Sequence, residues 1–156
     1  MTVGKNLAVG AGSGREGQRN LDTVVETIPM IKSLLKRNAS TLSGAQQQAV
    51  AIGRSLMSNP EVQLLNEVSL GLAPIIIDEL YYSLAVVQKR SLEIILVEQD
   101  LARSVTVADR IVCMLEGHNV LEGTPAHLSD EQITDVYLGH AIASFADGGP
   151  TDVRGD

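Results

Sequence analysis

The chain has 156 residues, a net charge of −7, and 44% hydrophobic and 20% charged residues. This composition is that of a globular protein with a core of its own, and it excludes a disordered chain. The acidic balance and the 3% of aromatic residues argue against a nucleic-acid-binding surface, which needs basic and stacking side chains. No apolar run approaches the ~20 residues of a membrane span, and residues 1–5 lack the apolar core of a signal peptide. The single cysteine, Cys113, fits a reducing cytoplasm.

The first third of the chain predicts a loop followed by two helical stretches. Residues 10–17 are rich in glycine, serine and charged residues and predict the loop. Apolar residues over 21–35 recur at helical spacing, and Pro29 is expected to break that helix. Ser43 begins the next helix, which runs to about Met57.

The rest of the chain alternates between short apolar runs and helical patterns. The run at 94–97 is continuously apolar, as expected for a strand buried on both faces. The pattern predicts, in order, a strand at 62–65, a helix at 75–90, a strand at 94–97, a helix at 100–108, strands at 111–114 and 120–121, and a helix that is capped by Ser129 and runs to about Tyr137.

This alternation predicts an α/β fold with a mostly parallel sheet and flanking helices. In such sheets, ligand-binding groups gather at the carboxyl ends of the strands. Asn66-Glu67 and Glu98-Gln99 each directly follow a predicted strand. We therefore expect these four side chains to lie at one edge of the sheet.

The most informative stretch is residues 42–48, Leu-Ser-Gly-Ala-Gln-Gln-Gln, which opens a helix. It is followed, one helix later, by the strand that ends at Asn66-Glu67. In this order the two segments resemble the signature motif and the Walker B strand of an ATP-binding-cassette (ABC) ATPase. The block 40–74 resembles, more narrowly, the ATP-binding subunit of branched-chain amino acid ABC importers.

The resemblance covers about residues 1–140 and implies a partial P-loop NTPase fold. It divides the chain into a helical subdomain with the signature motif at 1–58 and a core that runs from the Walker B strand onward at 59–140. The polar, glycine-rich residues 141–156 are expected to form a disordered tail.

The resemblance gives the start of the helix at Ser43 a role in binding ATP. An exposed helix N-terminus attracts phosphate through its unpaired N–H groups. In the family this turn contacts the γ-phosphate of ATP held by the opposite subunit, and Ser43, Gly44 and Gln46 match those positions. Ala45 departs from the family's glycine, and its Cβ can obstruct the approach of backbone to phosphate. Taken alone, Ser43 with Gln46 is also a capping box that needs no ligand.

The Walker B strand ends in Asn66-Glu67-Val68, where the family pattern is Asp-Glu-Pro. The family's aspartate helps to hold Mg²⁺, and the neutral carbonyl of Asn66 should bind that ion more weakly. Glu67 matches the catalytic glutamate that orients the attacking water. Gln99 occupies the switch position, where this importer subfamily commonly carries glutamine. Its amide can sense the γ-phosphate but cannot act as an acid or base.

A Walker A loop, Gly-x-x-x-x-Gly-Lys-Ser/Thr, is absent from the sequence. Gly4-Lys5 has no glycine upstream, and the glycines at 10–14 are followed by Arg15. The resemblance therefore covers only the later part of the ABC ATPase domain. Together with Asn66, the missing loop argues against autonomous ATP hydrolysis, so we expect the chain to be inactive alone.

The resemblance also implies partners. The intact family member binds ATP and Mg²⁺, dimerises with a second ATPase subunit and couples hydrolysis to uptake through membrane permease subunits. That assembly would place the chain in the cytoplasm, at the inner face of the cell membrane. Two alternatives stay open: a non-catalytic module that donates its signature turn to a partner ATPase, and a non-functional remnant.

Overall fold

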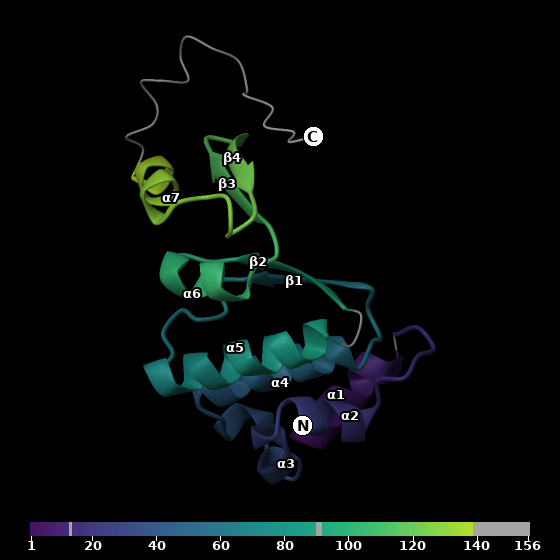
Figure 1. Cartoon of the computed structure of the whole chain (residues 1–156). Helices are drawn as coiled ribbons and strands as arrows, with labels where there is room; N and C mark the ends of the chain where they lie inside the picture. The colour runs from purple at the N-terminus through teal and green to yellow at the C-terminus, as the bar shows by residue number, and fades with distance from the viewer. Residues whose placement is uncertain (13, 90–91, 139–156) are drawn as a thin grey trace. The chain divides into compact units, whose positions relative to one another are not determined.

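The computed structural model describes residues 1–12, 14–89 and 92–138, and the chain divides into two compact units, Met1–Asp100 and Leu101–Asp156 (Figure 1). The expected tail at 141–156 lies outside the described residues. The expected boundary at residue 58 lies inside the first unit and stays a prediction. Among the described residues, no helix has the length and apolarity needed to cross a membrane.

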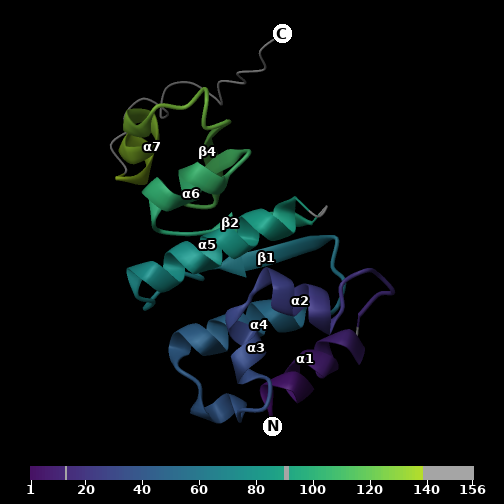
Figure 2. The same cartoon turned by 60° about the horizontal axis from the view of Figure 1, so that its bottom comes forward.

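The first unit begins with a small helical bundle, in which α1, α2 and α3 each contact α4 (Figure 2). Its core is built from fully buried aliphatic side chains of all four helices, among them Leu7, Val24, Ile31 and Leu56. The elements are α1 (Val3–Gly12), α2 (Leu21–Thr27), α3 (Met30–Leu34), the 3-10 turn η1 (Ala39–Thr41) and α4 (Gly44–Leu56).

The expected helix from Ser43 to about Met57 is confirmed as α4, with Ser43 as its N-cap and Met57 as its C-cap. The break at Pro29 is confirmed, because α2 ends at Thr27 and Pro29 caps α3. The loop at 10–17 is wrong in its first part, since α1 extends through Gly12. The glycine at position 10 is explained by packing and not by a turn: α1 lies so close to α4 that an added Cβ would overlap with the Arg54 carbonyl oxygen.

The first unit continues with a parallel pair of strands, β1 (Val62–Asn66) and β2 (Glu93–Val97), joined through α5 (Pro74–Gln88). The register pairs Val62 with Glu93 and Asn66 with Val97, so the two carboxyl ends coincide. This parallel sheet with its helices confirms the expected α/β class.

One face of this sheet is exposed. Leu65 is buried while Leu64 is 68% exposed, and on β2 Ile95 is 54% exposed. The expectation that the strand at 94–97 is buried on both faces is therefore wrong. The inner face packs on the core of the first unit through Leu65, Ile94 and Leu96, and the alternation of a strand turns Ile95 and Val97 away from it.

The second unit holds α6 (Leu101–Val107), the antiparallel hairpin of β3 (Ile111–Leu115) and β4 (His118–Gly123), and α7 (Asp130–Tyr137). Glu116 and Gly117 form its two-residue turn with φ of 49° and 82°, the two positive values of a type I′ hairpin turn. The expected cap of the last helix is confirmed, because the Ser129 Oγ accepts a hydrogen bond from the Gln132 N–H.

The contact of α1 with α4 predicts a contrast between two glycines of α1. Gly10→Ala should lower the free energy of unfolding by about 2–3 kcal/mol, because its Cβ meets rigid backbone of Arg54. Gly12→Ala, with nothing within 4 Å of its added Cβ, should leave that free energy unchanged or raise it by up to about 1 kcal/mol. Urea unfolding of the two variants measures the difference. Equal stabilities would show that α1 does not pack on α4 in this way.

Candidate functional site

The signature stretch forms the N-terminus of α4. Ser43 is extended, with φ −66° and ψ 162°, and is the N-cap of the helix. Its Oγ accepts from the Gln46 N–H at 3.4 Å, and the Gln46 Oε1 accepts from the Ser43 N–H at 3.2 Å. The capping box is therefore present.

The capping box leaves the first turn of α4 open for a ligand. The N–H groups of Gly44 and Ala45 have no partner inside the helix, as at any helix start. Gly44 is exposed, with nothing within 4 Å of an added Cβ. Ala45 is half-buried and lines a hollow beside α5. An anion can approach this turn from the Gly44 side.

The register of β1 and β2 brings the two predicted polar pairs together. The Glu67 N–H donates to the Val97 carbonyl at 2.8 Å, which extends the parallel ladder by one residue past β1. Beyond it, the Gln99 Nε2 donates to the Glu67 Oε1 at 3.0 Å. Glu67 and Gln99, 32 residues apart in sequence, thus form one hydrogen-bonded pair at the carboxyl edge of the sheet.

Glu67 adopts a left-handed backbone conformation, which could not be predicted from the sequence. Its φ is +48°, in the left-handed region that non-glycine residues occupy at a cost of about 1 kcal/mol or more. The turn that it makes is joined to β2 by the hydrogen bond to Val97 and carries the half-buried carboxylate back toward Gln99. Strain of this kind is a feature of functional sites.

A second contact across the same edge was not expected from the sequence. The Glu98 carboxylate accepts from Ser69 twice, from the N–H at 2.9 Å and from the Oγ at 2.7 Å. It also accepts from the Gln99 N–H at 3.3 Å. Glu98 therefore connects the loop after β1 to the segment that carries Gln99. The only signal in the sequence was the place of Glu98 at a strand end.

The start of α4 and the carboxyl edge of the sheet are not joined by hydrogen bonds. Among the described residues, no hydrogen bond joins Ser43 or Gln46 of α4 to Glu67 or Gln99 at the sheet edge. Each region makes its own local contacts and offers its own groups to a ligand.

The described residues do not build a metal site by themselves. Asn66 is exposed and presents a neutral amide, and the neighbouring Glu67 carboxylate already accepts from Gln99. Among the ranges that the structure describes, no three His, Cys, Asp or Glu side chains are grouped so that they could hold a metal ion. The fit to Mg²⁺ is therefore poor, because that ion favours several hard oxygen ligands.

Cys113 is not a nucleophile candidate. It lies half-buried in β3, and burial raises the pKa of its thiol above the ordinary value. The thiol stays protonated at neutral pH, whereas a reactive cysteine needs the thiolate.

No family model matches the chain, but individual known proteins do. BraG of Pseudomonas aeruginosa, a high-affinity branched-chain amino acid transport ATP-binding protein, is 38% identical over 142 residues, which are 89% of this chain and 61% of BraG. PotA of Aggregatibacter actinomycetemcomitans, a spermidine/putrescine import ATP-binding protein, is 30% identical over 84% of this chain and 36% of its own length. Over the span that it covers, the chain is similar to the ATP-binding proteins of ABC transporters.

Solved ABC structures share the fold. The ADP conformation of MJ1267, an ATP-binding cassette of an ABC transporter, superposes with a TM-score of 0.72 at 24% identity, over 89% of this chain and 63% of that one. CbiO1 of Clostridium perfringens, part of the ABC transporter complex cbiONQ, gives 0.73 at 23% identity over 91% and 61%. The chain thus spans about three fifths of BraG and of MJ1267, and just over a third of PotA. Its 156 residues contain no Walker A motif, and Gly4 and Lys5 lie inside α1.

The contact between Glu98 and Ser69 predicts how strongly the loop after β1 is protected from opening. Glu98→Ala removes both acceptors of Ser69, so the Ser69 amide should exchange its hydrogen at least about tenfold faster. Glu93→Ala removes an exposed carboxylate from the start of β2 and should leave that rate within about twofold. Amide exchange followed by NMR measures both. An unchanged Ser69 rate in Glu98→Ala would contradict the contact.

Proposed function

We propose that this chain is part of the ATP-binding subunit of an ABC importer for branched-chain amino acids. The sequence similarity to BraG supports the substrate class. The observation that carries the site is the hydrogen-bonded pair of Glu67 and Gln99 at the end of the Walker B strand. It is the arrangement that a water-positioning carboxylate and a γ-phosphate sensor need.

At this edge, Glu67 is the group that orients the attacking water. Phosphoryl transfer depends mainly on positioning and electrostatics, so a carboxylate fixed by a side-chain amide suits the task. The Gln99 amide both fixes Glu67 and can donate to a phosphate oxygen, but it moves no proton. Glu98 holds the Ser69 loop beside them and so acts on the geometry rather than on the reaction.

The first turn of α4 serves a second ATP molecule. Ser43, Gly44 and Gln46 present an open helix start whose N–H groups can bind the γ-phosphate of ATP held by another subunit. The partner subunit, which holds that ATP, would supply its phosphate-binding loop. Hydrolysis at the α4 turn therefore needs a second ATPase subunit. Through permease subunits, the assembly would lie at the inner face of the cell membrane.

The second candidate function is non-catalytic: the chain would only supply its α4 turn to the ATP site of a partner ATPase. Asn66 favours it, since this residue replaces the acidic Mg²⁺ ligand of the family while the α4 turn is preformed and exposed. In that role the chain would complete the partner's ATP site without hydrolysing ATP at its own.

The α4 turn predicts an ATP-dependent association. Mixed with a BraG-type subunit whose Walker B glutamate is changed to glutamine, the chain should form a heterodimer with ATP but not with ADP. Ser43→Glu places a negative charge where the phosphate binds and should weaken this association at least about tenfold. Sedimentation velocity measures the heterodimer.

The chain offers a matched control for this experiment. Ser129 begins α7 with the same capping box as Ser43, including a glutamine three residues later. Ser129→Glu should cost a similar amount of helix stability and leave the association unchanged. Equal loss in the two variants, or a wild-type chain that does not respond to ATP, would count against the proposal.

A further inference from the structure

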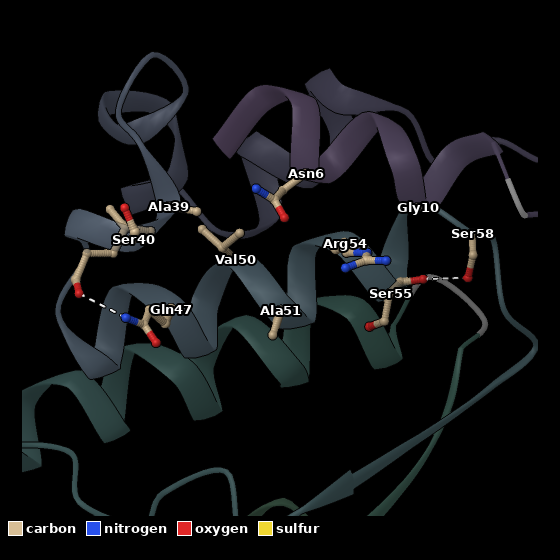
Figure 3. Close-up of a pocket in the computed structure, with 11 residues that line it drawn as sticks. Asn6, Gly10, Ala39, Ser40, Gln47, Val50, Ala51, Arg54, Ser55 and Ser58 are labelled. Atoms are coloured by element: carbon tan, nitrogen blue, oxygen red, sulfur yellow. Dashed lines mark hydrogen bonds between the residues drawn. The ribbon is translucent and has the colours of Figure 1, made fainter. Parts of the chain in front are cut away.

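A hollow of about 610 Å³ lies between α1, α4 and the segment 39–42, away from the sheet edge (Figure 3). Asn6 enters it from α1, Ser40 from η1, and Gln47, Val50 and Arg54 from α4. Neither Ser43 nor Gly44 lines it. The hollow is thus separate from the turn proposed to bind ATP.

Arg54 carries the only charge among the residues that line this hollow. In a chain with a net charge of −7, no acidic side chain is placed opposite it there. Across the part of the chain that the structure describes, the Arg54 guanidinium has no hydrogen-bond or ion-pair partner. The wall of the hollow therefore carries an uncompensated positive charge.

The stem of Arg54 is held by α1. Gly10 lies so close that an added Cβ would stand 3.1 Å from the Arg54 Cγ and would overlap with its carbonyl oxygen. The start of the exposed Arg54 side chain therefore lies against α1.

The neutral polar side chains of the hollow make hydrogen bonds within the protein, and the Ser40 Oγ donates to the Asn38 Oδ1 at 3.1 Å. The Asn6 Nδ2 donates to the Thr2 carbonyl at 3.1 Å, and the Gln47 Nε2 donates to the Leu42 carbonyl at 3.1 Å. The Ser55 and Ser58 hydroxyls likewise donate to carbonyls within α4 and at its end. The guanidinium fork of Arg54 is the main free donor, and its two parallel N–H groups match one carboxylate.

Part of the lining of the hollow is apolar. It consists of Leu42 and Val50, which are 7% and 6% exposed, together with Ala39 and Ala51. An alkyl chain attached to the carboxylate would replace water on this surface. Inorganic phosphate could use the charge of Arg54 but not the apolar wall.

We propose that this hollow binds a small organic carboxylate, with the carboxylate on Arg54 and a short alkyl body on Leu42 and Val50. The assignment rests on the charge and the lining of the hollow and does not depend on the role proposed for the α4 turn.

NMR titration of the full chain with sodium pentanoate tests this proposal. The signals of the Arg54 Nε and the Asn6 amide should shift in a saturable way, and pentanoate should bind at least tenfold more tightly than acetate or inorganic phosphate. Non-saturable shifts, or shifts centred elsewhere, would overturn the site. Equal or tighter binding of phosphate would overturn the assignment to an organic acid.

Variants separate the hollow from general charge effects. Arg54→Gln should weaken pentanoate binding at least tenfold, whereas Lys32→Gln, which removes the same charge from the exposed side of α3, should leave it within twofold. Ala51→Glu places a carboxylate on the exposed lining of the hollow and should weaken binding as strongly without removing Arg54. If a folded Arg54→Gln or Ala51→Glu chain binds pentanoate like the wild type, the proposal is wrong.

Discussion

The candidate catalytic geometry depends on the in-register parallel pairing of β1 and β2. Because Asn66 lies opposite Val97, the residues that follow the two strands leave the sheet together. A shift of one residue would turn the side chains of one strand to the other face and would separate Glu67 from Gln99. The register of the ladder therefore determines whether Glu67 and Gln99, which are far apart in sequence, can form their hydrogen bond.

This edge is held together by three further interactions. The hydrogen bond from the Glu67 N–H to Val97 continues the ladder, and the left-handed φ of Glu67 turns the chain just after it. Glu98 then fastens Ser69 with two hydrogen bonds. Hydrogen bonds to a carboxylate are among the stronger ones in proteins, so the loop after β1 and the segment after β2 are expected to move as one body.

Helix α4 is the second organising element, because its two ends serve different purposes. Its N-terminus is closed by the Ser43 capping box and stays open to an anion at Gly44. Farther along, Gly53 and Gly10 allow α1 and its neighbours to approach closely, and this packing presents Arg54 to the hollow. One helix therefore links the proposed ATP turn to the proposed carboxylate site.

Much of this arrangement could be predicted from the sequence, since its signals are local. Helical spacing, Pro29 and the Ser43 and Ser129 caps predicted most helices, and the position of polar residues after apolar strands predicted the edge that holds Glu67 and Gln99. The rest depends on tertiary contacts. The glycine-rich start of 10–17 reads as a loop because the close packing of Gly10 on α4 cannot be seen in the sequence.

Two other features were hidden for the same reason. A continuously apolar strand says nothing about which of its faces is covered, so the exposure of Ile95 was missed. Likewise, the hydrogen bonds from Ser69 to Glu98 could not be predicted from the local sequence, because 29 residues separate the two.

The central claim is that this chain supplies groups to an ATP site without holding the nucleotide by itself. A thermal melt of the purified chain with and without Mg-ATP tests it most directly. A ligand that binds only the folded state must raise the melting temperature. The account predicts no shift for the chain alone. A reproducible rise of about 2 °C or more would contradict it, because a complete nucleotide site would then exist within these 156 residues.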